Sequence, residues 1–251
     1  MQGRAKSVKK AARPAISIVM PAYNEEANIE KTLRASSDVL DALGMPGEIV
    51  VTNDGSRDHT LDVLTSLERE VPGLVVVNHE KNRGYGAALR SAVEAASGEY
   101  IVTIDSDGQF DIAELPGFIE NRRNGTAVVT GYRKKKRDSM FRVLANRGLN
   151  GFITLLFGVR FTDINCAFRL YRADVLKEIN IESSGYQAPS EIMIKLVNKG
   201  HRTEEIGVNH YAREGGVSAL RPMKAITQMT AFLIYLKLKT VLYKKGMITS
   251  L

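Results

Sequence analysis

The chain has 251 residues, 44% of them hydrophobic, which suits one large α/β domain or a domain with an appendage. Its formal net charge of +7 attracts anionic partners, but no nucleic-acid-binding motif accompanies that charge, so nucleic acid is not expected as a partner. Cys166 is the only cysteine, which excludes an intrachain disulfide and favours a reducing compartment.

The first half of the chain alternates short apolar runs with helical segments. The apolar runs are nearly continuous, which is typical of parallel strands buried on both faces. The sequence therefore predicts an α/β fold with a mostly parallel sheet, helices on both faces, and ligands at the carboxyl ends of the strands. We expect strands over 16–20, 48–52, 74–78, 100–104 and 127–130, and helices after Asn24, from Asp58 to about Arg69, and from Gly84 to Ala96.

The pattern changes after about residue 138. There we expect a helix over 140–157, a strand over 166–171, a helix over 190–198 and a strand over 203–210. The best candidate for a membrane helix is 225–243, but its uncharged run, 225–236, is only 12 residues long, whereas spanning needs roughly 20. We expect this segment either to lie in a membrane interface or to pack on the core. The basic first residues have no apolar run, so they are not expected to be a signal peptide.

Asp105-Ser106-Asp107 follows the fourth expected strand. Two carboxylates at this spacing converge on one point when the chain turns, and Mg²⁺ or Mn²⁺ prefers carboxylate and phosphate oxygens. Gln109 follows at the same spacing. An acidic turn without function would look alike in isolation, but the position after a buried parallel strand favours a metal and diphosphate site.

Three more polar segments end expected strands. In 52–56, the Asp54 carboxylate could accept a hydrogen bond from a nucleobase, although an ordinary Asn-Asp-Gly turn is the alternative. The segment 21–26 offers a helix start, an aromatic ring and carboxylates, or simply a capped turn. In 82–88, two glycines let the backbone approach a ligand, but the third glycine of a dinucleotide fingerprint is missing, which disfavours nicotinamide binding.

These four segments, in this order, resemble glycosyltransferase family 2, which has the GT-A fold. The likeness is greatest to polyprenyl-phosphate sugar transferases, such as dolichyl-phosphate mannose and glucose synthases, and runs from about Ile16 to Pro222. It implies a metal-dependent glycosyltransferase that uses a nucleotide-diphosphate sugar. The motifs are Pro21-Ala-Tyr-Asn-Glu-Glu, Asn53-Asp-Gly-Ser, Asn82-Arg-Gly-x-Gly-x-Ala and Asp105-x-Asp-x-Gln109.

The second half carries two further segments of the family. Residues 163–171 resemble its Asp-x-x-x-Gly-Phe-Arg/Lys segment, with Ala167 where glycine is usual, and residues 213–218 resemble its Arg-x-x-Gly-x-Ser segment. The resemblance implies a basic tail over 1–14, a GT-A domain over 15–220 with a nucleotide-sugar half (15–133) and an acceptor half (134–220), and an amphipathic helical tail over 221–251.

The resemblance also assigns roles to individual residues. The expected nucleotide-sugar contacts are Pro21, Ala22, Tyr23, Glu25, Asp54, Asp105 and Ser106. The expected ligands of Mg²⁺ or Mn²⁺ are Asp105, Asp107 and Gln109. The expected contacts of the acceptor or donor phosphate are Arg133, Arg213 and Ser218. The expected catalytic residues are Asp107, Arg133 and Glu191.

The nature of the acceptor decides whether a general base is needed. An alcohol acceptor needs one, and Glu191 lies where relatives with soluble acceptors carry theirs. A phosphate monoester is already ionised near pH 7 and needs cations instead, which the basic run 133–137 offers. The histidines His59, His79 and His201 have no ligand spacing and are expected at the surface or as caps.

The leading interpretation is inverting transfer of a hexose from a GDP- or UDP-sugar to a polyprenyl phosphate. The enzyme is expected to be cytoplasmic and peripheral, at the cytoplasmic face of a membrane. One alternative is a family 2 transferase acting on a sugar or small-molecule hydroxyl, with Glu191 as base. A non-catalytic nucleotide-sugar-binding protein is the other alternative, against which the intact Asp105, Asp107 and Gln109 set argues.

Overall fold

The computed structural model describes residues 14–123, 125–134, 140–213, 215 and 222–251, with side chains for all of these except 140–147 and 222–224. Seven strands form one sheet in the order β3-β2-β1-β4-β6-β5-β7. Only β6 runs antiparallel to its two neighbours, and the other pairings in the sheet are parallel. The strands are β1 (Ile16–Ala22), β2 (Gly47–Asn53), β3 (Leu74–Asn78), β4 (Tyr100–Thr103), β5 (Thr126–Arg133), β6 (Arg169–Arg172) and β7 (Arg202–Val208).

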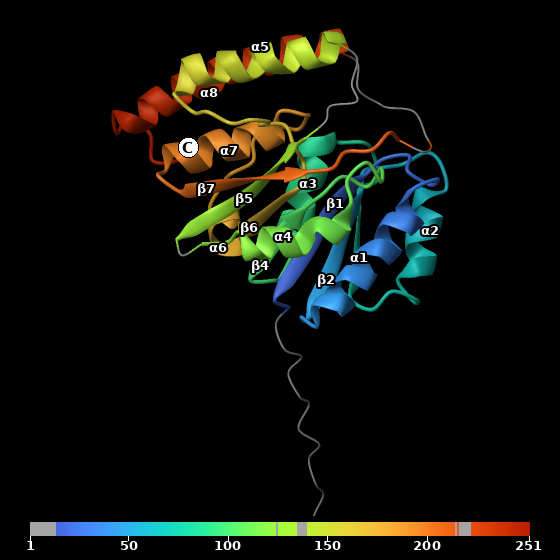
Figure 1. Ribbon diagram of the computed structural model, residues 1–251. Helices are drawn as coiled ribbons and strands as arrows, with labels where there is room; N and C mark the ends of the chain where they lie inside the picture. The colour runs from blue at the N-terminus through green and yellow to red at the C-terminus, as the bar shows by residue number, and fades with distance from the viewer. Residues whose placement is uncertain (1–13, 124, 135–139, 214, 216–221) are drawn as a thin grey trace, which may run out of the picture.

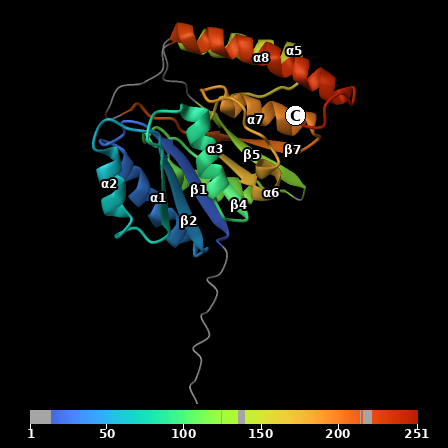
Figure 2. The ribbon, with the colours of Figure 1, turned by 180° about the vertical axis from the view of Figure 1, so that it is seen from behind.

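Helices cover both faces of this sheet (Figures 1 and 2). One face carries α1 (Ile29–Leu43), α2 (Thr60–Leu67), the short 3₁₀ helix η1 (Ile112–Glu114) and α4 (Leu115–Glu120). The other face carries α3 (Tyr85–Ala95), α6 (Ala173–Lys177) and α7 (Ala188–Asn198). The remaining helices, α5 (Met140–Phe157) and α8 (Pro222–Lys244), lie side by side as an outer layer beyond α7.

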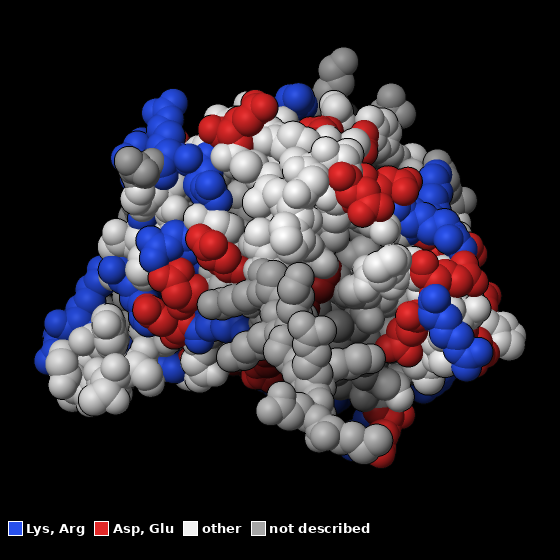
Figure 3. Space-filling model, turned by 90° about the horizontal axis from the view of Figure 1, so that it is seen from below, with Lys and Arg blue, Asp and Glu red and all other residues white. Residues whose placement is uncertain are grey.

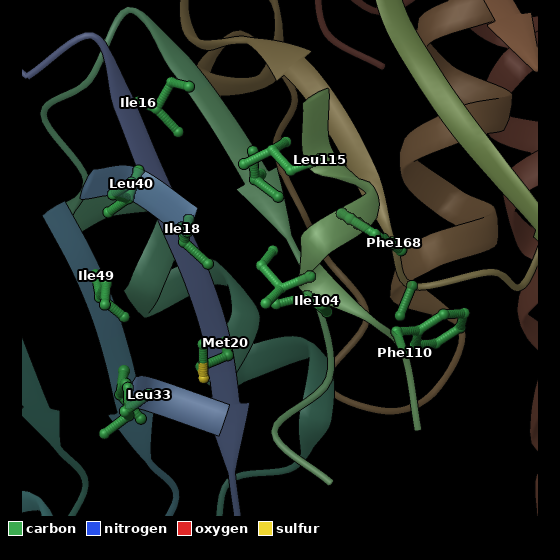
Figure 4. Packing of buried hydrophobic residues seen from close by; sticks show 14 of the residues in the cluster. Ile16, Ile18, Met20, Leu33, Leu40, Ile49, Ile104, Phe110, Leu115 and Phe168 are labelled. Carbon is green, nitrogen blue, oxygen red and sulfur yellow. The ribbon is translucent and has the colours of Figure 1, made fainter. Parts of the chain in front are cut away.

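The core lies on both faces of the sheet, and β1 shows why its sequence is continuously apolar. Ile16, Ile18 and Met20 point into the cluster shared with α1 and β2, as Figure 4 shows. Val19 points to the opposite side, into the cluster beneath α3 and α7. Successive side chains of a strand alternate between its two faces. When both faces are buried, the sequence therefore shows a nearly continuous apolar run and not an alternation of apolar and polar residues.

The predicted fold class is confirmed. The five strands of the first half and the helix over 140–157 lie where they were expected. The short helices α4 and α6 were not expected, and the strand expected over 166–171 begins only at Arg169. The expectation for Asn24 was wrong. The first helix begins at Ile29, and Asn24 instead has a positive φ of 55°.

Helix α8 is apolar on two opposite sides. One side packs inward through Met229, Leu233, Leu236 and Thr240, and α8 contacts α5 and α7. The other side exposes Ile234, Leu238 and Leu242. By length and composition, the segment Ala225–Lys244 is the one helix of the described residues that could cross a membrane. One side of α8 therefore packs on the core, as one of the two expectations had it. Contact of the other side with a membrane interface stays a prediction.

Candidate functional site

The polar segments meet at the carboxyl ends of β1, β2 and β4. The Asp54 N–H donates to the Ala22 carbonyl (2.8 Å), and the Ile104 N–H donates to the Val19 carbonyl (3.2 Å). A segment from far along the chain joins this edge, because the Tyr211 N–H donates to the Gln109 carbonyl (2.8 Å). The opposite end of the molecule, where β1 begins, shows Lys and Arg interspersed with Asp and Glu (Figure 3).

A cluster of charged side chains forms at this edge from Glu25, Asp105, Asp107 and Arg213, and we call it the charge cluster. The Arg213 guanidinium donates to Glu25 Oε1 (2.9 Å) and to Asp107 Oδ2 (3.0 Å). Burial raises the pKa of Glu25, although hydrogen bonding from Asn28 and the charge of Arg213 oppose that rise. Arg213 therefore joins the ends of β1 and β4 to the second half of the chain.

Asp105 is the most perturbed carboxyl of the charge cluster. Burial raises the pKa of Asp105 to about 7, and the negative charge of Asp107 adds to the rise. A hydrogen bond from the Tyr85 hydroxyl (2.9 Å) and the positive charge of Arg133 act in the opposite direction. A buried carboxyl whose ionisation is opposed by a neighbouring carboxylate favours a bound cation.

The carboxylates of the charge cluster fit a divalent cation that brings further ligands with it. Among the described residues, no three His, Cys, Asp or Glu side chains form a complete metal site. Mg²⁺ at nucleotide sites is typically held by one or two carboxylates together with substrate phosphates, and Asp105 and Asp107 supply such a pair. The side-chain amide of Gln109 donates to the Tyr211 carbonyl (2.9 Å), and its backbone N–H donates to Asp107 Oδ1 (3.1 Å). These contacts fix the turn that follows β4. The role of Gln109 as a direct ligand stays a prediction.

The loops after β1 and β2 are tied together by reciprocal hydrogen bonds. The N–H groups of Asn24 and Glu25 donate to the hydroxyls of Ser56 (3.0 Å) and Thr60 (2.8 Å). In return, Asn24 Oδ1 accepts from the Arg57 N–H (2.8 Å). The positive φ of Asn24 serves this connection, which therefore holds the expected nucleoside contacts Tyr23 and Glu25 in one rigid unit.

Other expected nucleotide contacts are buried inside the fold. Pro21 and Ala22 are buried in β1. The Ser106 hydroxyl donates to the Pro21 carbonyl (2.8 Å), and the Ser106 carbonyl accepts from Thr32 (3.2 Å). Ser106 thus locks the turn after β4 onto β1 and α1. Contacts of Pro21, Ala22 and Ser106 with a nucleotide stay predictions.

Asp54 is buried and holds the loop before α3. Its carboxylate accepts from the N–H groups of Arg83 (2.9 Å) and Gly84 (2.8 Å), and from His79 Nδ1 (2.8 Å). The expectation for His79 was wrong: the ring is buried and also bonds to the Ser91 hydroxyl (2.9 Å). His79 directly follows β3 at its carboxyl end, a position that could have indicated its proximity to the site.

Glu191 is engaged by several groups of the chain itself. Its side chain is fully buried at the start of α7. It accepts from the N–H groups of Glu182 (2.8 Å) and Ser183 (2.9 Å) and from the Ser183 hydroxyl (2.6 Å), and it pairs with Lys195 (2.8 Å). All of these partners come from the chain itself, and the role of Glu191 as a general base stays a prediction.

Arg133 ends β5 in a bidentate ion pair with Asp163, at 2.6 and 3.1 Å. The Asp163 side chain is fully buried and the Arg133 side chain is 15% exposed. This pairing joins Arg133, the first residue of the basic run 133–137, to Asp163, the first residue of the segment 163–171. Ser218 and the run 135–137 lie outside the described residues.

Gly84 and Gly86, at the start of α3, make room for a loop of the chain itself, whereas the sequence predicted that they let the backbone approach a ligand. A Cβ atom on Gly86 would lie 2.2 Å from the Ser183 carbonyl oxygen, and one on Gly84 would lie 2.3 Å from that of Ser184. This loop, residues 182–187, was missed in the sequence because it carries no motif. It places Tyr186 against Tyr85 and hence beside the charge cluster.

Comparisons with known proteins identify the family of the chain. A model of the family described as Glycosyl transferase family 2 matches residues 17–180. The chain therefore belongs to glycosyl transferase family 2. It is 33% identical over 216 residues to an undecaprenyl-phosphate 4-deoxy-4-formamido-L-arabinose transferase from Edwardsiella ictaluri, and 32% identical to the protein of that name from Serratia proteamaculans. Each alignment covers 85% of this chain and 65% of the relative, slightly less than two thirds of its length.

Solved structures agree on the fold. Glucosyl-3-phosphoglycerate synthase from Mycobacterium tuberculosis, in complex with phosphoglyceric acid, superposes with a TM-score of 0.70 at 22% identity, covering 92% of this chain and 81% of that one. The same enzyme with Mn²⁺ and uridine-diphosphate-glucose gives a TM-score of 0.67 at 23% identity, covering 94% and 80%. These proteins share the GT-A architecture that the family resemblance implied.

Proposed function

We propose that the chain transfers a sugar, with inversion, from a nucleotide-diphosphate sugar to a polyprenyl phosphate. The observation that carries this proposal is the charge cluster at the carboxyl ends of β1 and β4, in a member of glycosyl transferase family 2. The names of the relatives, undecaprenyl-phosphate sugar transferases, support the acceptor class.

The donor would bind over the charge cluster. Asp105 and Asp107 would hold Mg²⁺ or Mn²⁺, which offsets the charge that grows on the departing nucleotide diphosphate. The solved neighbours with Mn²⁺ or Mg²⁺ contain UDP, which supports a uridine nucleotide over a guanine nucleotide. The loops tied by Asn24, Ser56 and Thr60 would hold the nucleoside.

A phosphate acceptor fits the second half better than an alcohol. A phosphate monoester needs cations to hold it and no base to activate it. Arg213 in the charge cluster and Arg133, whose positive charge acts on Asp105, offer such cations, whereas Glu191 is fully engaged beneath the loop 182–187. The hydroxyl-acceptor alternative thereby loses the base on which it depended.

The outer layer of α5 and α8 supports a lipid-linked acceptor at a membrane surface. Its exposed apolar side chains include Leu155, Ile234 and Leu238. Neither 140–157 nor 222–251 contains an acidic residue. Exposed apolar side chains with positive charge bind anionic lipid surfaces, and a negative surface potential is characteristic of the cytoplasmic leaflet. The cations of these segments are Arg142, Arg147, Lys224, Lys237, Lys239, Lys244 and Lys245.

The donor proposal is tested by titration calorimetry with UDP-glucose, UDP-N-acetylglucosamine and GDP-mannose, with and without Mn²⁺. We expect metal-dependent binding to one nucleotide class, followed by transfer to undecaprenyl phosphate in detergent micelles. If none of the three donors binds in either condition, the donor proposal is overturned. Donor binding with transfer only to hydroxyl acceptors would overturn the acceptor proposal alone.

Arg133 gives a separate test of the acceptor. Because it pairs with the buried Asp163, both must be changed to avoid an unpaired buried charge, as in R133A/D163N. We expect transfer to undecaprenyl phosphate to fall by about 100-fold, in the range for losing one electrostatic contact to a reacting group, while donor binding survives. The matched control is R172A/D174N, an exposed Arg–Asp pair. Unchanged transfer in R133A/D163N would remove Arg133 from the acceptor site.

A further inference from the structure

Tyr186 places an exposed aromatic ring beside the charge cluster. It stacks on Tyr85, with ring centroids 5.5 Å apart and an interplanar angle of 27°. The Tyr85 hydroxyl donates to Asp105 Oδ1 (2.9 Å). The inner ring is thus fixed to the expected metal carboxylate, while the outer ring, on Tyr186, is 43% exposed.

The loop that carries Tyr186 is anchored on several sides. The Gly86 N–H of α3 donates to the Ser184 carbonyl (2.9 Å). From α7, Glu191 accepts from the backbone of Glu182 and Ser183. From α8, the Tyr235 hydroxyl donates to Glu182 Oε2 (2.6 Å), and Lys239 also bonds to the Glu182 carboxylate. Three elements therefore hold the loop, so the exposed ring has a preorganised position.

The surroundings of Tyr186 select the kind of ligand. Burial, and then the negative charge of Asp105, raises the pKa of its hydroxyl, whereas the positive charge of Arg213 opposes that rise. The aromatic face itself carries no positive charge with which to hold a phosphate. A sugar ring instead offers C–H groups to an aromatic face and hydroxyl groups to nearby polar atoms.

We propose that the stacked rings of Tyr85 and Tyr186 form an aromatic wall against which the sugar of the donor packs, with Tyr186 as the contacting residue. This rests on the proposed function, because the sugar hangs from the diphosphate that would lie on Asp105 and Asp107. Tyr186 then contributes to the choice of the sugar, whereas Tyr85 holds the ring of Tyr186 in position. Glu182 is a positioning residue through which α8 supports the wall.

The test compares a nucleotide with and without its sugar. The variants Tyr186→Ala, Tyr186→Leu and Tyr186→Phe are titrated with UDP and with UDP-glucose in the presence of Mn²⁺, or with GDP and GDP-mannose if the wild type binds guanine nucleotides. The control is Tyr243→Ala, a tyrosine near the end of α8. Binding of the bare nucleotide reports that each variant is folded and that its diphosphate site is intact.

We expect Tyr186→Ala and Tyr186→Leu to weaken binding of the nucleotide sugar by about 5- to 10-fold, the range for one lost aromatic contact. Binding of the bare nucleotide, the Tyr186→Phe variant and the Tyr243→Ala control should each match the wild type within about 2-fold. Equal weakening of nucleotide and nucleotide sugar, or no weakening of either, would overturn the aromatic wall. Those outcomes leave the proposed function standing, since it fails only if the wild type itself binds no donor or transfers no sugar.

Discussion

Two regions of the molecule bury carboxylates in opposite ways. In the charge cluster, Asp105 accepts a hydrogen bond from the Tyr85 hydroxyl, and burial raises its pKa to about 7. Beneath the loop 182–187, Glu191 is more deeply buried, yet two N–H groups, a hydroxyl and Lys195 satisfy it. Perturbed, under-satisfied groups gather at functional sites, whereas fully bonded ones hold the structure. The perturbed Asp105 is therefore the candidate for ligand binding, and the bonds of Glu191 support the loop 182–187.

The largest effect should come from breaking the charge cluster. Asp107→Asn removes a carboxylate that faces the metal and the diphosphate, so we expect transfer to fall by about 100-fold or more and Mn²⁺ to lose its effect on donor binding. The free energy of unfolding should change by only about 1 kcal/mol, because two effects oppose each other. The substitution weakens the bond to Arg213, but it also removes the repulsion between the negative charges of Asp105 and Asp107. Transfer assays and urea denaturation measure the two quantities, with Asp38→Asn on exposed α1 surface as control. Normal transfer in D107N would place the diphosphate elsewhere.

The reverse pattern is expected at Glu191. Glu191→Gln breaks a pair whose two side chains are fully buried, which costs on the order of 3–5 kcal/mol in the free energy of unfolding. The matched control is Glu70→Gln, whose pair with Arg34 is exposed and contributes about 1 kcal/mol or less. Urea denaturation of both variants gives the comparison. If E191Q keeps the stability of the wild type but loses transfer to hydroxyl acceptors, Glu191 is the base after all.

A smaller effect on stability is expected at Glu182, which anchors the same loop. Burial tends to raise the pKa of Glu182, but hydrogen bonds from Lys195, Lys239 and Tyr235 outweigh it and lower the pKa from 4.5 to about 2. Because the folded-state pKa is depressed, the stabilisation is fully present above pH 4.5 and is lost as the pH falls from 4.5 to about 2. The difference in unfolding free energy between wild type and Glu182→Gln should therefore shrink across that window. A difference that stays constant over the window would mean that the charge of Glu182 does not anchor the loop.

The sequence by itself determined the fold class and the donor edge of the site. Continuous apolar runs identify strands buried on both faces, and polar residues directly after such strands must gather at one edge of a parallel sheet. For this reason Glu25, Asp105 and Asp107 could be placed together before any contact was known. The single cysteine, Cys166, excluded an intrachain disulfide from the sequence alone, and in the structure it is a buried free thiol.

Only the tertiary structure decided what each polar group bonds to, because those partners come from distant parts of the chain. Arg213 reaches Asp107, Tyr186 stacks on Tyr85, and α8 holds Glu182, and no local periodicity records any of these contacts. Glu191 at a helix start looks the same in sequence whether it faces a substrate or a loop. Its burial and its partners, which depend on how α7 packs against the loop 182–187, give it a supporting role.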